Sequence, residues 1–134
     1  MAGRIVINVD GGARGNPGPA AVAAVASDPE GNVLAERSDE IGEATNNVAE
    51  YRAMLLGVEL AKELGATEVE LIGDSELIVR QLLGDYRVKQ AHLQPLHAEV
   101  TAALEDLGAW SMRAVKREQN ARADELVNET LDAG

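Results

Sequence analysis

The hydrophobic and polar positions of the first forty residues predict three strands. Arg4 to Asp10 is rich in β-branched residues, and Ala20 to Ala26 is a run of alanines and valines. Gly11 to Pro19, dense in Gly and Pro, predicts a tight loop between these strands. A turn signal over residues 28–32 then leads to a third strand over Val33 to Ile41. Three strands joined in this way predict an antiparallel meander.

Helical spacing begins after the third strand. Apolar residues recur every three or four positions between the start signal Thr45-Asn46-Asn47 and a stop at Gly65. The remaining predicted elements are a strand over Glu68 to Gly73, a helix from Ser75 to Leu83, a polar connector over Asp85 to His92, a helix from Pro95 to about Leu107, a strand over Trp110 to Lys116, and a helix from its cap Asn120 to Leu131.

The resulting order, β-β-β-α-β-α-α-β-α, predicts an α/β fold. Hairpin-joined strands that later alternate with helices predict a five-stranded mixed sheet, with three antiparallel strands first and parallel strands after them, flanked by helices. We expect residues 1–134 to form a single domain, which is either the whole protein or the first domain of a longer one. We also expect a monomer.

Composition narrows the chemistry that such a domain can carry. The chain has no cysteine and two histidines, which excludes a disulfide scaffold, a thiolate metal site and a cysteine nucleophile. A metal bound here would therefore be a hard, oxygen-liking cation such as Mg²⁺ or Mn²⁺. No apolar run approaches the roughly 18 residues of a membrane span, and no leader sequence is recognisable, so we expect a cytoplasmic protein with no membrane partner.

Charge and aromatic content argue against generic binding of nucleic acid. Lys and Arg number 12 and Asp and Glu 23, giving a net charge of −11, and aromatic residues make up 2%. Such a chain repels nucleic acid at long range and lacks a base-stacking platform. Binding would therefore depend on local cations, for which the candidates are Arg14, Arg87, Lys89, Arg113, Lys116, Arg117 and Arg122.

Four acidic residues lie where ligands collect in α/β folds. Asp10 and Asp74 end predicted strands, whereas Glu50 and Asp124 lie in the first turns of predicted helices. Each has an ordinary alternative, such as opening a turn, forming a capping box with Asn47, or stabilising a helix dipole. Held together, the four would repel one another unless cations lay between them. Two Mg²⁺ ions about 3.5–4 Å apart would satisfy them and would act on phosphate.

Four segments together carry a family resemblance. They are residues 10–20 (DGGARGNPGPA), 45–51 (TNNVAEY), 74–77 (DSEL) and 117–126 (REQNARADEL). In this order and spacing they resemble ribonuclease H type 1, over nearly the whole chain. The resemblance implies the ribonuclease H-like fold and an endonuclease that hydrolyses the RNA strand of RNA/DNA hybrids, with two Mg²⁺ or Mn²⁺ ions, leaving 3′-OH and 5′-phosphate ends. It assigns metal binding and catalysis to Asp10, Glu50, Asp74 and Asp124.

The resemblance also implies which residues contact the substrate. A hybrid is distinguished by 2′-hydroxyls on one strand, which closely approaching backbone and neutral amides can detect. The corresponding residues are Gly11, Gly12, Arg14, Asn16, Asn46, Asn47, Ser75 and Glu76. The asparagines have an alternative as helix caps or turn residues. Double-stranded RNA also displays 2′-hydroxyls and is a second candidate substrate.

The chain departs from the family pattern at two places. The connector Gly84 to Gln94 is short and resembles the form of the family without a basic, Trp-containing protrusion. We therefore expect weak or strongly salt-dependent binding. Many family members also carry a histidine before the last carboxylate, where this chain has Glu118-Gln119-Asn120. Arg117 and Glu118 are candidate substitutes.

Two alternative functions are weaker. A proofreading-type exonuclease of this fold has a second acid two residues after the first, but Gly12 occupies that position. Loss of even one of the four carboxylates would have favoured a catalytically silent module that binds hybrids or double-stranded RNA, but all four are present. A similar fold alone does not establish the activity, so the binding module remains the alternative.

Overall fold

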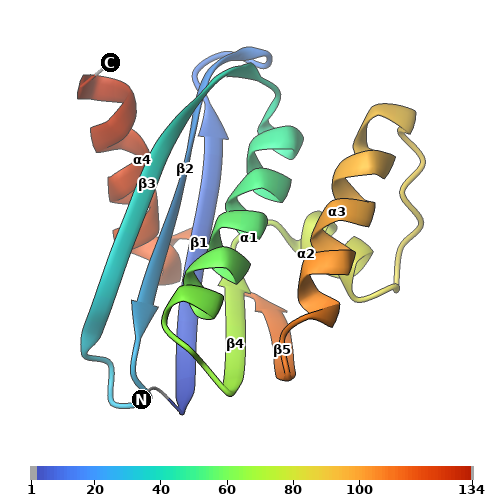
Figure 1. Ribbon diagram of the computed structural model, residues 1–134. Helices are drawn as coiled ribbons and strands as arrows, with labels where there is room; N and C mark the ends of the chain where they lie inside the picture. Colours follow the sequence, from blue (N-terminus) through green and yellow to red (C-terminus); the bar gives the residue numbers. More distant parts are fainter. Residues whose placement is uncertain (1–2, 134) are drawn as a thin grey trace.

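The computed structural model describes residues 3–133, which form a five-stranded sheet flanked by helices (Figure 1). The elements are β1 (Arg4–Ala13), β2 (Gly18–Ser27), β3 (Val33–Ala44), α1 (Asn46–Glu63), β4 (Glu68–Gly73), α2 (Glu76–Leu82), a 3₁₀ turn (Ala91–Leu93), α3 (Gln94–Glu105), β5 (Ala109–Ala114), a second 3₁₀ turn (Arg117–Asn120) and α4 (Ala121–Ala133). Within residues 3–133, no helix is both long and apolar enough to cross a membrane.

The strand order is β3-β2-β1-β4-β5. The first three strands pair antiparallel, and β4 pairs parallel with both β1 and β5. This is the predicted mixed sheet. Because β1 lies in the middle, it has an antiparallel neighbour on one side and a parallel neighbour on the other.

Both faces of the sheet are covered, and the small residues of β2 reflect this. Alternate residues of a strand point to opposite faces. Val22, Ala24 and Ala26 belong to the large core under α1, whereas Ala21 and Ala23 join a smaller core with α4. Figure 1 shows α4 on the face of the sheet opposite α1. A strand buried on both faces has no polar side, which explains its near-continuous apolar sequence.

The first two strands extend further than the sequence predicts. Gly11, Gly12 and Ala13 continue β1 and pair with residues 20–22 of β2, so the predicted loop over residues 11–19 is wrong for much of its length. Glycine is depleted in strands, but here the backbone ladder overrides this preference. As a consequence Asp10 lies inside β1 and not at its end.

Other boundaries also differ. The strand β3 reaches Ala44, beyond the predicted end at residue 41. The strand β5 spans Ala109–Ala114 and so ends two residues before the predicted end at Lys116. The last helix begins directly after Asn120, as predicted, but the side chain of Asn120 bonds to β1 and not to the helix. Its side-chain amide donates to the carbonyl of Val9 at 2.8 Å and its Oδ1 accepts from Asn8 Nδ2 at 3.0 Å. These bonds tie the start of α4 to β1.

The approach of α1 to the sheet is close at Gly57. A Cβ at this position would lie 2.6 Å from Val9 Cγ1 and 3.2 Å from Ile7 Cγ2. Such distances are shorter than atoms in a packed core tolerate. Because Gly57 has no side chain, α1 can pack this closely on β1.

Replacing Gly57 by valine should lower the free energy of unfolding by about 1–3 kcal/mol, because the added carbons overpack the contact with β1. Urea unfolding followed by circular dichroism measures this. The matched control is Glu59→Val on the exposed side of α1, which we expect to change the free energy by about 0.5 kcal/mol or less. An equal decrease in the free energy of unfolding in both variants would show that the low helix propensity of valine, and not close packing, causes the effect.

Candidate active site

Asp10, Glu50 and Asp74 converge at one end of the sheet. Each offers a carboxylate oxygen, and these atoms lie within 4.8 Å of one another. The parallel register of β1 and β4 explains why Asp10 and Asp74 lie together. Asn8 of β1 lies opposite Ile72 of β4 in the last pair of their parallel ladder. Asp10 and Asp74, each two residues further on, therefore lie side by side just beyond the point where this pairing ends.

Glu50 reaches this pair from α1. The amide of Gly11 donates to Glu50 Oε1 at 3.2 Å. A Cβ at Gly11 would lie 2.2 Å from the carbonyl oxygen of Ala49, so only glycine allows β1 and α1 to meet here. Glu50 lies just beyond the first turn of α1, and not within that turn as the sequence suggested. The helix is capped by Thr45, whose hydroxyl accepts from the amide of Val48, so Glu50 is free of the predicted capping box.

The environment of the three acids disfavours their charged forms. Burial, and then the charge of Asp74, raises the pKa of Asp10 from 3.8 to about 7. Burial and the charge of Asp10 raise the pKa of Glu50 well above its ordinary value. Burial also raises the pKa of Asp74, although the guanidinium of Arg117 opposes this. Clustered, partly buried carboxylates with raised pKa values are a donor set that suits a hard divalent cation.

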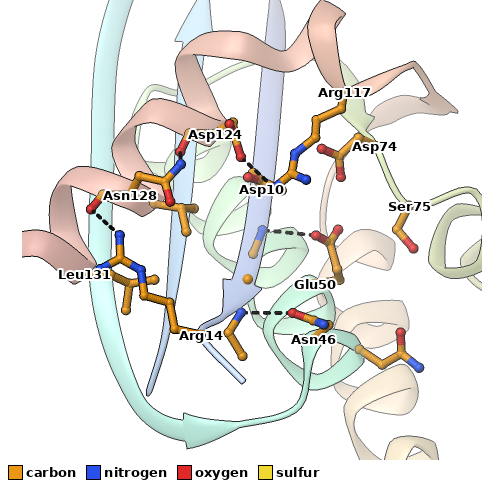
Figure 2. A pocket seen from close by; sticks show the side chains of 15 residues that line it. Asp10, Arg14, Asn46, Glu50, Asp74, Ser75, Arg117, Asp124, Asn128 and Leu131 are labelled. Carbon is orange, nitrogen blue, oxygen red and sulfur yellow. Dashed lines mark hydrogen bonds and ion pairs between the residues drawn. The ribbon is translucent and has the colours of Figure 1, made fainter. Parts of the chain in front are cut away.

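Asp124 completes the acidic wall from α4. It lies in the first turn of that helix, as predicted, and lines the same cavity as the other three acids. Its Oδ1 accepts from Arg117 Nη2 at 3.2 Å. Figure 2 shows the Arg117 side chain reaching over the cavity between Asp124 and Asp74. The guanidinium of Arg117, one of the two residues predicted to substitute for the absent histidine, therefore lies at the acidic cluster.

Most of the predicted substrate residues line this cavity of about 550 Å³. Those that do so are Gly11, Gly12, Arg14, Asn46, Asn47 and Ser75. The other two lie outside its lining. Asn16 Oδ1 accepts from the amide of Asn46 at 3.0 Å and so braces the loop against α1. Glu76 forms an i,i+4 ion pair with Arg80 at 3.6 Å, next to the cap residue Ser75.

Three residues of α4 that sequence reasoning missed also line the cavity. Val127, Asn128 and Leu131 form its far wall together with Asp124. They follow Asp124 by three, four and seven residues, and positions with this spacing share one face of a helix. This spacing could have predicted from the sequence that they lie beside Asp124. The carbonyl of Asn128 accepts from Arg14 Nη2 at 3.4 Å (Figure 2).

Four of the predicted cations that lie outside the lining of the acidic cavity form two sets. Arg122 forms ion pairs with Glu36 of β3 and two acids of α4, and Arg113 pairs with Glu70 at 3.1 Å. Both are therefore engaged with neighbouring acids. Arg87 and Lys89 instead line a second groove beside the cavity, and Asn47 lines both hollows.

The sequence is similar to those of known proteins. A family model described as "Reverse transcriptase-like" matches residues 8–130. The chain is 42% identical to a ribonuclease HI of Halobacterium salinarum over 130 residues, which cover 97% of this chain and 65% of that protein. It is 43% identical to the bifunctional protein Rv2228c of Mycobacterium tuberculosis over 131 residues, covering 97% of this chain and 36% of that protein. The chain thus spans about a third of the mycobacterial protein.

Solved structures agree in fold and in extent. The crystal structure of RNase H1 from Halobacterium salinarum matches with a TM-score of 0.95 at 41% identity, covering 98% of this chain and 99% of that chain. LC11-RNase H1, solved in complex with an RNA/DNA hybrid, matches with a TM-score of 0.91 at 47% identity, covering 96% and 97%. Both matches take in all four carboxylate-bearing segments. On these relatives and this fold, the chain belongs to the ribonuclease HI family.

Proposed function

We propose that this protein is an endoribonuclease that hydrolyses the RNA strand of RNA/DNA hybrids, leaving 3′-OH and 5′-phosphate ends. The observation that carries the proposal is the cluster of Asp10, Glu50 and Asp74, whose oxygens lie within 4.8 Å of one another at the floor of a polar cavity. Membership of the ribonuclease HI family, and a relative solved with a hybrid, support the choice of substrate.

The acidic residues fit a divalent metal site. The three clustered carboxylates, together with Asp124 beside Asp10, would hold two Mg²⁺ or Mn²⁺ ions. Bound there, such ions would supply activation of a water for attack on phosphorus and stabilisation of the leaving oxygen. The raised pKa of Asp10, caused by burial and then by the charge of Asp74, supports this assignment, because a bound cation would stabilise the charged carboxylate.

Other residues of the cavity would position the hybrid. The backbone of Gly12 lies open to the cavity, and the amides of Asn46 and Asn47 line its rim, where they would bind sugars and phosphates of the two strands. Arg117, paired with Asp124, would offset negative charge at the reacting phosphate. These donors are local, which is how an acidic protein would retain a polyanion.

Replacing Asp10 by asparagine should reduce metal-dependent cleavage of a labelled hybrid by about 1,000-fold or more, because several kcal/mol of transition-state stabilisation depend on the bound ions. The control is Asp39→Asn on the exposed strand β3, which should cleave at the wild-type rate. Matched double-stranded RNA, double-stranded DNA and single-stranded RNA define the specificity.

Internal cuts confined to the RNA strand of the hybrid would support the proposed nuclease. A wild-type protein that binds the hybrid but cuts no substrate with either metal would contradict it. That result would instead favour the catalytically silent binding module.

Asp10 should also make the metal-free protein less stable as pH rises. Its folded-state pKa of about 7 exceeds the unfolded value of 3.8, so between these values the unfolded chain binds fewer protons and stability falls. We expect Asp10→Asn to gain about 2–4 kcal/mol relative to wild type between pH 4 and pH 8. Urea unfolding in EDTA measures the difference. A constant difference across this range would show that Asp10 titrates normally.

The cations of the second groove should contribute to hybrid binding. Removing Arg87 and Lys89 together (Arg87→Ala, Lys89→Ala) should weaken binding and reduce the slope of log Kd against log salt by about one to two, because fewer counterions are released. Fluorescence anisotropy over a salt series measures the slope. The control pair Arg4→Ala and Lys62→Ala, whose side chains pair with Glu68 and Asp106, should leave the slope unchanged. An unchanged slope in the groove variant would exclude phosphate contact there.

A further inference from the structure

A buried hydrogen bond joins the helix that carries Glu50 to the helix that follows Asp74. The hydroxyl of Tyr51 in α1 donates to Oε1 of Gln81 in α2. Tyr51 is fully buried and Gln81 is only 6% exposed. Between such groups a hydrogen bond is directional and poorly replaced by water. The bond therefore constrains the distance between α1 and α2.

Gln81 is held from a second side by α3. Its backbone carbonyl accepts from Nε2 of His97 at 3.0 Å, so this ring nitrogen carries a proton. The rings of His97 and Tyr51 meet edge to face, with centroids 6.3 Å apart and planes at 79°. The three helices on this face of the sheet thus meet at Gln81.

The same turn of α1 is fixed on its other side by β1. The close approach of Gly11 to the carbonyl of Ala49, and the hydrogen bond from Gly11 to Glu50, leave no room between strand and helix. Ala49, Glu50 and Tyr51 are consecutive, so β1 holds the first two and α2 holds the third. The helix α2 begins directly after Asp74 and is capped by the hydroxyl of Ser75.

We infer that Tyr51 and Gln81 are positioning residues whose hydrogen bond sets the separation of Glu50 from Asp74 and thereby the affinity for the divalent metal. The inference rests on the proposed function, in which these carboxylates bind Mg²⁺ or Mn²⁺. Neither side chain touches the reacting atoms. Small hard cations require fixed oxygen positions, and groups that orient the ligands typically change metal affinity by about 10- to 100-fold.

The test uses the substrate-free protein titrated with MnCl₂ by calorimetry. Tyr51→Phe removes the hydroxyl and keeps the ring, so the fold is preserved. We expect the Kd for Mn²⁺ to rise by about 3- to 10-fold, less than for a group bonded directly to a ligand. Excess Mn²⁺ should restore the rate of hybrid cleavage, since the altered geometry weakens binding of the metal and leaves its ligands in place.

Two further variants separate positioning from general loss of stability. Gln81→Met removes the acceptor and should raise the Kd equally, and the double variant should raise it no further, because both side chains act through one bond. The matched control is Ile5→Val, which removes one methyl group from a fully buried residue near the opposite end of β1. It should lower the melting temperature to a similar extent and leave the Mn²⁺ affinity unchanged.

Each outcome decides the inference. An unchanged Kd in Tyr51→Phe, with melting lowered as in Ile5→Val, would overturn it and leave the bond a purely structural one. Additive increases in the double variant would also overturn it. If wild type binds no Mn²⁺, or if its Mn²⁺ binding survives in Asp10→Asn, the inference and the proposed metal site both fail. If wild type binds Mn²⁺ but leaves the hybrid intact, only the nuclease proposal fails, and the titration still decides the positioning role.

Discussion

Carboxylates crowded at one end of the sheet repel one another, and the surrounding structure is arranged so that they cannot move apart. Asp10 and Asp74 extend from neighbouring parallel strands, whose backbone ladder fixes their spacing. Glu50 is brought to them by a helix that touches β1 at a glycine with no space for a side chain. The raised pKa values of these acids express the cost of the arrangement in the absence of a cation.

The packing of α1 connects this site to the core. Because Gly11 and Gly57 have no side chains, α1 can approach β1 closely at both positions. The Tyr51 hydroxyl fixes the same helix to α2. Geometry at the site therefore depends on contacts made well inside the protein. Binding sites built on such rigid elements hold their ligands more accurately than sites built on loops.

The distribution of charge is compatible with the proposed polyanionic substrate, although the chain has a net charge of −11. Arg14 and Arg117 line the cavity, each paired with an acid of α4. Other acids are engaged away from the cavity, as in the pairing of Glu36 with Arg122. Long-range repulsion thus remains, while the groups within reach of a bound phosphate include cations and neutral amides.

The sequence by itself determined the element order and the mixed sheet, because hydrophobic periodicity and turn residues are local signals. It also predicted the four acidic residues that line the cavity. Local signals misplaced the ends of β1 and β2, where pairing across the ladder extends both strands through glycines. They also assigned Asn120 to a helix cap, although its amide bonds to β1. Only the tertiary structure decided that Arg117 reaches Asp124, that Asn16 and Glu76 lie outside the cavity lining, and that Tyr51 joins Gln81. Those contacts depend on the packing of elements distant in sequence, and no local pattern encodes the relative depth and rotation of two helices.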